Sequence, residues 1–320
     1  ERFGRVVAGE VNPSGRTADP YVTDLTASPW WNNFGDFKYT NTEELNSDSS
    51  FFDPAGTTPS FVNYVEGIYV GYKFYETAAD EGLIDYDKTV VYPFGRGLSY
   101  TTFTQTLNSV TEADDTITVD VTVTNTGSAS GKEVVEVYYN PPYTNGGIEK
   151  ASANLIGFAK TSELAPGASE NVTVTFKAED MASYDTYGAG TYILDAGDYY
   201  FTAATDAHNA VNNILAAKGY TVESTNGKMT ADGNADLTYT WTEDALDTTT
   251  YATSANGTAI TNQLSCADPN LYDGEDNTVT WLSRSDWNVT LPTETVKLAL
   301  TEQLKKDLQD IRYDPADYET

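Results

Sequence analysis

The sequence predicts an α+β fold that is mostly β, with a loop-rich region containing helices, then a β-sandwich, then an amphipathic C-terminal helix. Two observations support this prediction. Between residues 101 and 205, short stretches of alternating apolar and polar residues are separated by turn sequences, which is typical of a β-sandwich. Near the C-terminus, leucines recur at helical spacing after residue 295.

The region before residue 100 is expected to consist of short elements joined by long loops. Residues 1–9 can form the end of a helix, which the turn sequence at 12–15 would stop. Residues 16–61 are rich in Asp, Asn, Ser, Thr and Pro and are expected to form a long loop, the kind of segment that often serves function. Alternation over residues 67–74 favours a strand, and a short helix over 75–81 would follow.

The sandwich prediction rests on strands whose apolar residues would share one face. In the clearest case Val119, Val121 and Val123 would face a core while the residues between them face water. The predicted strands are residues 116–123, 133–139, 155–160, 171–176 and 198–203.

The last third of the chain gives weaker signals. Residues 206–294 are expected to be an insertion or extension of uncertain fold, which opens with a short helix and continues, up to residue 250, with strand-like stretches rich in Thr and Tyr. Residues 295–320 are expected to form a helix and a linker, and Thr301 could cap that helix. Apolar residues of the two predicted helices are Val211, Ile214 and Leu215 in the first, and Leu300, Leu304, Leu308 and Ile311 in the second. The chain is therefore divided into segments 1–100, 101–205, 206–294 and 295–320.

The composition excludes several classes of partner. Forty-eight acidic against 18 basic residues give a net charge of −30, which repels nucleic acid and anionic membranes. No apolar run approaches the roughly 20 residues that span a bilayer. Cys266 and His208 are the single residues of their kinds, so we expect no zinc site, and we expect His208 to be a surface or capping residue. The start resembles the middle of a protein and gives no indication of compartment, so a cytoplasmic and a secreted soluble protein both remain open.

Three segments resemble hallmarks of family-3 glycoside hydrolases, in that family's order. They are residues 11–16 (VNPSGR), 66–75 (EGIYVGYKFY) and 92–100 (YPFGRGLSY). Residues 123–127, 131–135, 155–158 and 164–167 resemble the fibronectin-III-like domain that many members contain. The resemblance implies that 1–100 is the end portion of the α/β sandwich domain and that 101–205 is the fibronectin-III-like β-sandwich. Residues 280–287 (TWLSRSDW) resemble a segment of members in which these domains precede the barrel.

The resemblance also implies a function. Members are exo-acting, retaining β-glycosidases, which need two carboxyl groups about 5 to 5.5 Å apart and no cofactor. Their nucleophile lies on a barrel and their acid commonly on an earlier part of the sandwich domain, so we expect no catalytic carboxylate here. The expected partners are a catalytic barrel domain, in the same or another chain, and a β-linked oligosaccharide or aryl glucoside as substrate.

Some residues are nevertheless candidates for a site. Asp286 lies in a Ser-Asp-Trp triplet like that around the family's nucleophile, but polar residues precede it where an apolar barrel strand would be expected. Trp30, Trp31, Phe34 and Asp36 combine aromatic faces with a carboxylate, as sugar binding requires. The alternative is that the aromatic residues anchor the loop onto its own domain or onto the barrel. Glu66 and Arg96 are expected to be a buried structural pair. The acidic residues between 268 and 276 lack the spacing of a calcium loop, and no metal is expected.

A second class of function is a non-catalytic carbohydrate-binding or cell-surface interaction module built on the sandwich. An exposed aromatic strip on the sandwich would favour it. The hallmarks before residue 100 favour the enzyme fragment, because a sandwich that acts alone would not need them.

Overall fold

The computed structural model describes residues 2–41, 60–265, 268, 270, 278–304 and 306. The chain forms two compact units, each assembled from two separate stretches. We call Glu1–Leu25 with Ile68–Thr261 the sandwich unit, and Thr26–Gly67 with Asn262–Thr320 the loop unit. This division cuts across the predicted segments 1–100 and 206–294.

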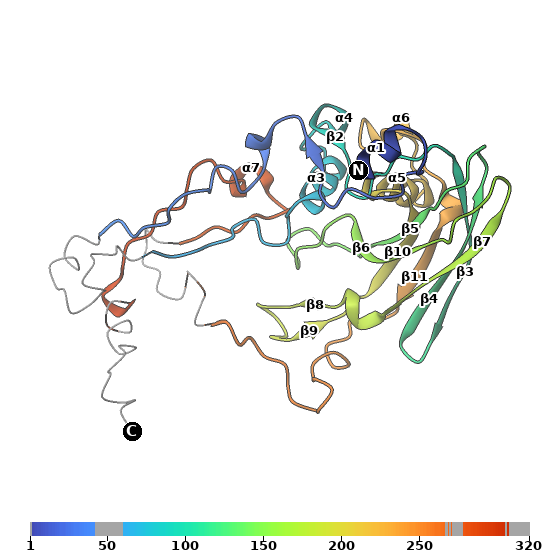
Figure 1. The fold of residues 1–320 in the computed structure, drawn as a ribbon. Helices are drawn as coiled ribbons and strands as arrows, with labels where there is room; N and C mark the ends of the chain where they lie inside the picture. The colour runs from blue at the N-terminus through green and yellow to red at the C-terminus, as the bar shows by residue number, and fades with distance from the viewer. Residues whose placement is uncertain are drawn as a thin grey trace, which may run out of the picture. The chain divides into compact units, whose positions relative to one another are not determined.

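Two antiparallel sheets form the body of the sandwich unit (Figure 1). The first has the order β3-β4-β7, with β3 at Phe103–Ala113, β4 at Thr116–Asn125 and β7 at Ser169–Lys177. The second has the order β11-β10-β5-β6, with β11 at Thr238–Glu243, β10 at Gly197–Ala204, β5 at Val134–Asn140 and β6 at Asn154–Lys160. Every predicted strand of segment 101–205 is confirmed and β3 was not predicted, while β11 lies in the Thr/Tyr-rich part before residue 250 that was expected to contain strand-like stretches.

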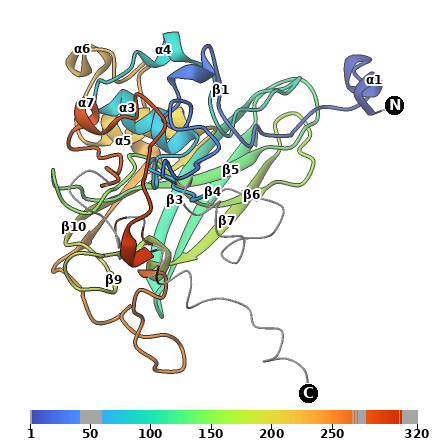
Figure 2. The ribbon, with the colours of Figure 1, turned by 90° about the vertical axis from the view of Figure 1, so that its left-hand side faces the viewer.

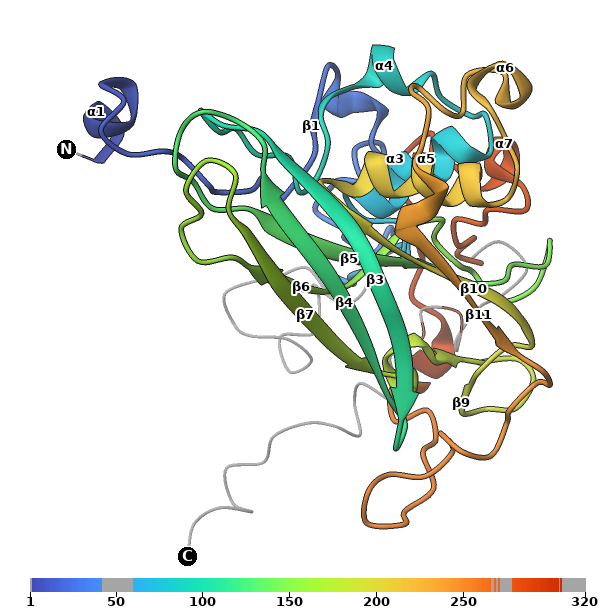
Figure 3. The same cartoon turned by 90° about the vertical axis from the view of Figure 1, so that its right-hand side faces the viewer.

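The core between the sheets follows from the alternation in the sequence. Along β4 the side chains of Val119, Val121 and Val123 are buried, while the residues between them are partly exposed. From the other sheet Phe201 packs edge-to-face on Phe176 of β7, with ring centroids 5.2 Å apart. Figure 3 shows the β3-β4-β7 sheet lying across strands β5 and β6. Burial of each such apolar side chain contributes roughly 1.5–3 kcal/mol to folding.

Two helices cover the outer face of the second sheet (Figure 2). Helix α5, Ala207–Ala217, follows β10 directly and begins where the Asp206 side chain accepts a hydrogen bond from the Asn209 amide. Its Ala210, Val211 and Leu215 pack with Tyr138 of β5, which confirms the helix predicted after residue 206. Helix α3, Tyr72–Asp80, contacts α5.

The strand predicted over residues 67–74 is wrong, because residues 65–68 form a turn and α3 begins at Tyr72. Gly67 and Gly71 adopt φ values of +54° and +56°, which break an extended backbone and which only glycine adopts readily. The predicted short helix is confirmed, but it starts earlier than expected. Its buried residues run continuously from Phe74 to Ala79.

Short elements complete the description. Those of the sandwich unit are α1 (Arg2–Val7), β1 (Tyr21–Val22), α4 (Tyr86–Thr89), β2 (Val90–Tyr92), η2 (Ala178–Met181), β8 (Ser183–Tyr184), β9 (Tyr192–Ile193), α6 (Val222–Thr225) and η3 (Ala235–Leu237). The 3-10 turn η1 spans Leu25–Ala27, and α7 (Trp287–Thr290) belongs to the loop unit. Strands β1 and β2 pair with each other, as do β8 and β9.

The loop unit is held by a small apolar cluster and by backbone pairing. Val65, Val279 and Leu298 form its buried centre.

The Leu304 amide donates to Thr301 Oγ1 at 3.1 Å, as the predicted cap of the C-terminal helix requires, but Leu308 and Ile311 lie outside the described residues. Across the described part of the chain, no helix has the length and apolar character needed to cross a membrane.

Candidate functional site

The aromatic residues predicted to bind substrate lie together in the loop unit. The Trp30 ring is 5.6 Å from that of Trp31 and 6.3 Å from that of Phe34, both edge-to-face. Their exposed fractions are 37% for Trp30, 44% for Trp31 and 77% for Phe34. Asp36 is exposed and pairs with Lys38 at 3.2 Å, and the hydrogen bond from Lys38 lowers the pKa of the Asp36 carboxyl. The cluster therefore offers aromatic surface to a ligand, with an ionised carboxylate close by in the sequence.

Asparagine side chains hydrogen-bond this loop to other parts of the loop unit. The Asn33 side chain is buried, donates to Asn63 Oδ1 at 2.7 Å and accepts from the Val296 amide at 3.1 Å. Asn32 donates to the Pro292 carbonyl at 3.0 Å. These bonds position the backbone beside the rings, and both substrate binding and loop anchoring by the rings stay predictions.

Asp286 lies elsewhere in the loop unit, in a setting unlike the end of a barrel strand. It is the exposed N-cap residue of the one-turn helix α7, and its side chain makes no capping bond. Its backbone carbonyl accepts from Thr290 Oγ1 at 2.7 Å. In the described part of 278–304 no strand precedes it. The geometry gives no support to Asp286 as a nucleophile.

The first and third hallmarks are joined through Asn12. Asn12 Oδ1 accepts from Ser99 Oγ at 3.0 Å and from the Tyr100 amide at 2.8 Å. Asn12 Nδ2 donates to the Ser130 carbonyl, 2.9 Å away, in the loop that leads to β5. One side chain thus ties both hallmarks to the sandwich, which is a structural role.

An arginine in the first hallmark makes the buried ion pair that was expected of Arg96. Arg16 pairs with Glu133, whose carboxylate is almost fully buried. Arg96 is exposed, and its guanidinium lies 5.2 Å from the centre of the Tyr92 ring. The prediction of a buried Arg96 is therefore wrong. Sequence position within a hallmark did not show which arginine side chain faces the core.

Glu136 on β5 is a buried carboxyl beneath the third hallmark. Its exposed fraction is 4%, and burial raises its pKa from an ordinary value of 4.5 to about 7, against the opposing effects of Tyr138 and Arg16. Tyr138 donates its hydroxyl hydrogen to Glu136 at 2.6 Å. A carboxyl of this kind is often catalytic when it lines a cleft. Here Gly95 closes over it so tightly that a Cβ at that position would overlap the carboxylate, so a substrate has no access.

His208 forms a second buried polar cluster, and its predicted place at the surface is wrong. Its Nδ1 lies 2.7 Å from Glu76 Oε2, and its Nε2 lies 2.8 Å from Thr230 Oγ1. The ring stacks on Tyr86 with centroids 3.5 Å apart, and the Tyr86 hydroxyl donates to Glu76 at 2.5 Å. A histidine–glutamate pair can move protons. Because Glu76 is completely buried, this cluster instead connects α3, α4 and α5.

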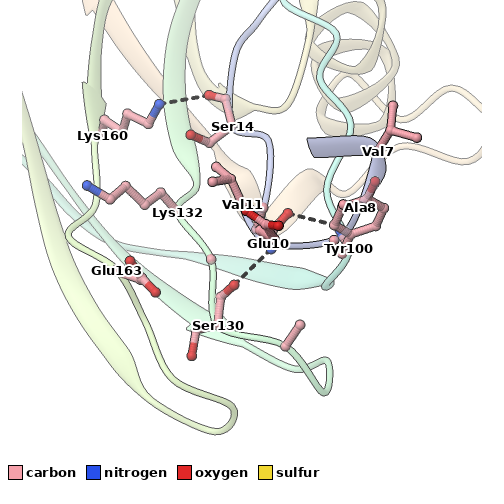
Figure 4. A pocket seen from close by; sticks show the side chains of 14 residues that line it. Val7, Ala8, Glu10, Val11, Ser14, Tyr100, Ser130, Lys132, Lys160 and Glu163 are labelled. Atoms are coloured by element: carbon pink, nitrogen blue, oxygen red, sulfur yellow. Dashed lines mark hydrogen bonds between the residues drawn. The ribbon is translucent and has the colours of Figure 1, made fainter. Parts of the chain in front are cut away.

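A surface hollow with a volume of about 860 Å³ lies between the segment after α1 and the edge of the sandwich (Figure 4). Lys132 and Lys160 line one side, and Glu10 and Tyr100 line another. Lys160 donates to the Ser14 carbonyl at 2.8 Å, and Glu10 pairs with Arg5 at 3.1 Å. Lys160 and Glu10 therefore already interact with neighbouring protein groups. Among described residues, no group of three or more His, Cys, Asp or Glu is placed to hold a metal ion.

Comparisons with known proteins agree with the predicted resemblance. The family model described as a fibronectin type III-like domain matches residues 133–207. Beta-glucosidase A of Butyrivibrio fibrisolvens is 34% identical over 246 residues, which cover 70% of this chain and 26% of that protein. The beta-glucosidase of Ruminococcus albus is 35% identical over 210 residues, covering 64% of this chain and 19% of that protein.

A solved structure supports the same relationship. Beta-glucosidase 3B from Thermotoga neapolitana, in complex with glucose, aligns with a TM-score of 0.52 at 27% identity, covering 76% of this chain and 26% of that chain. The present chain thus spans about a quarter or less of the length of these relatives. Over this part of their length the chain is therefore similar to β-glucosidases of the family-3 glycoside hydrolase type, and residues 133–207 match a fibronectin type III-like domain.

Proposed function

We propose that the chain is the non-barrel part of an exo-acting, retaining β-glycosidase, most closely a β-glucosidase, that hydrolyses O-glycosyl bonds. The observation that carries the proposal is the 34% identity to a β-glucosidase over 70% of the chain. In this proposal a catalytic barrel, in the same or another chain, supplies the nucleophile. The substrate is a β-linked oligosaccharide or an aryl glucoside, and the two-carboxylate mechanism needs no cofactor.

The proposed domain organisation follows the resemblance. Residues 1–100 correspond to the end of an α/β sandwich domain and 101–205 to the fibronectin-III-like sandwich. Residues 206–294 are an insertion or extension, and 295–320 are a helix and a linker toward the barrel. In this arrangement the chain contributes no catalytic carboxylate, and Asp286 lies at the start of the one-turn helix α7 without a catalytic role.

The chain's own contribution to substrate binding is assigned to Trp30, Trp31, Phe34 and Asp36. The exposed rings suit the C–H faces of a sugar, which pack on aromatic surface. Asp36 stays ionised because its pKa is lowered, so it accepts hydrogen bonds from sugar hydroxyls and does not act as an acid. These residues would form a wall of the substrate site and position the sugar.

The proposal is tested first with the purified 320-residue chain and an aryl β-glucoside. A folded chain should give no turnover, and robust turnover would contradict a barrel located elsewhere and make Asp286 the next residue to replace. In the longer enzyme, Trp31→Ala should raise KM for a cello-oligosaccharide about tenfold, with a smaller change in kcat. Phe158→Ala, which removes an exposed ring from β6, is the matched control and should leave KM unchanged. An unchanged KM in Trp31→Ala would remove the aromatic residues from the site.

A further inference from the structure

Besides the aromatic residues of the loop unit, a further group of exposed aromatic residues lies in the fibronectin-III-like domain, on the hairpin formed by β8 and β9. We call residues 183–193 the tyrosine hairpin, because Tyr184, Tyr187 and Tyr192 all lie on it. Tyr187 has an exposed fraction of 92% and Tyr192 of 41%. The rings of Tyr184 and Tyr192 pack edge-to-face with centroids 5.4 Å apart. Exposed apolar residues scattered singly are ordinary, but here the exposed Tyr187 and Tyr192 lie on one short hairpin.

Internal hydrogen bonds hold the tip in one conformation. The Asp185 carboxylate accepts from the amides of Gly188 at 2.9 Å and Ala189 at 2.7 Å. The Gly190 amide donates to the Asp185 carbonyl at 2.8 Å, and the Tyr184 hydroxyl donates to the Gly190 carbonyl at 2.8 Å. Tyr187 therefore projects from an ordered turn, so little conformational entropy of the backbone would be lost when a ligand binds.

The base of the hairpin is anchored in the sandwich unit. Ile193 and Leu194 are buried. The buried Lys150 side chain donates to Ser183 Oγ at 2.6 Å and pairs with Asp195 at 2.7 Å, on either side of the hairpin. The exposed tyrosines are thus presented by a rigid support.

We propose that the tyrosine hairpin is a saccharide-binding surface, distinct from the aromatic residues of the loop unit, that holds a neutral β-linked glucan. A tyrosine ring packs on the C–H face of a sugar while its hydroxyl stays in water, so an exposed tyrosine suits a hydrated ligand. The net charge of −30 disfavours polyanionic ligands and leaves a neutral polymer favoured. The choice of β-linked glucose rests on the proposed β-glucosidase function, but the surface itself does not.

The test is titration of the 320-residue chain with cellohexaose, a soluble hexamer of β-linked glucose, by calorimetry. The wild-type chain should bind, and Tyr187→Ala and Tyr192→Ala should each weaken binding about tenfold. Tyr220→Ala removes a ring of similar exposure after α5 and should bind like the wild type. Circular dichroism of each variant reports its fold.

Three results would overturn the proposal. The first is no binding of cellohexaose by the wild-type chain, and the second is equal binding by the wild type and Tyr187→Ala. The third is concentration-dependent dimers in sedimentation that Tyr187→Ala abolishes, because these would assign the hairpin to a contact between two copies of the chain. The measurement does not involve turnover. Failure of the proposed glycosidase function would therefore appear as no hydrolysis of aryl β-glucosides by the longer enzyme, and failure of this inference would appear only in the titration.

Discussion

Replacement of Gly95 by alanine tests whether the third hallmark is locked onto the sandwich by its contact with Glu136. Gly95 has a φ of +84°, so alanine there costs about 1–2 kcal/mol of backbone strain. The new Cβ would also overlap the buried Glu136 carboxylate, and such overpacking typically costs about 1–3 kcal/mol. The two effects together predict a loss of about 2–5 kcal/mol.

Gly167 provides a matched control on the same unit. Its φ is +80°, close to that of Gly95, but a Cβ there would meet nothing within 4 Å. Gly167→Ala should therefore show the strain alone, and Gly95→Ala should lose about 1–3 kcal/mol more. Urea denaturation followed by circular dichroism measures both free energies of unfolding.

A double variant separates the contact from other effects. In Gly95→Ala with Glu136→Ala, the methyl group gains room, so the combined loss should be smaller than the sum of the single losses. Equal losses for the Gly95 and Gly167 variants, together with additivity in the double variant, would refute the claim that Gly95 locks the third hallmark onto the sandwich by its contact with Glu136.

Three other predictions follow from the buried polar groups and the candidate residues. In the folded protein the pKa of Glu136 is about 7, against an ordinary value of 4.5. Ionisation of Glu136 should therefore lower the free energy of unfolding by roughly 3 kcal/mol as pH rises from 4.5 to 7, with little further change above pH 7. Glu136→Gln should remove that loss. If the urea midpoint changed equally between pH 4 and pH 8 in the wild type and in Glu136→Gln, the raised pKa of Glu136 would be contradicted. His208→Ala leaves the Glu76 carboxylate buried without its imidazole partner and should cost about 3–5 kcal/mol in the same urea assay, whereas Lys297→Ala, at an exposed ion pair, should cost less than about 1 kcal/mol. Asp286→Asn in the longer enzyme should leave kcat within about twofold of wild type, because the side chain makes no capping bond and no covalent intermediate is assigned to it; a loss on the order of a thousandfold would make it the nucleophile.

The sequence predicted those strands in which apolar and polar residues alternate strictly, as in β4. Strand β3 was missed because Phe103, Leu107 and Val110 are its only partly buried apolar residues, and its register with β4 shifts between Leu107 and Ser109. The Thr/Tyr-rich residues around β11 indicated strand-like stretches, but not their partner. Strand β11 pairs with β10, and a helix and a long connection separate the two strands, so nothing local indicated this pairing.

The candidate site shows the same limit. Trp30, Trp31 and Phe34 could be predicted as a group because they are neighbours in sequence, and the rings indeed contact each other. His208 and Glu76 are 132 positions apart, and only the packing of α5 on α3 brings them together. A lone histidine among polar residues gave no signal of burial. The tyrosines of the β8–β9 hairpin could have been found from their clustering between residues 184 and 192.

The position of β11 has a consequence for where this domain can be cut. The family match ends at residue 207, but β11 begins at Thr238 and forms one edge of the second sheet beyond β10. Its Trp241 also covers the rings of Tyr199 and Phe201, at 5.4 and 6.2 Å. A protein ended at the family boundary would leave the backbone of β10 as an open strand edge beside bare aromatic rings, and such an edge recruits other chains into aggregates. Expression of this domain as a dispersed protein therefore requires the chain to continue at least through Glu243.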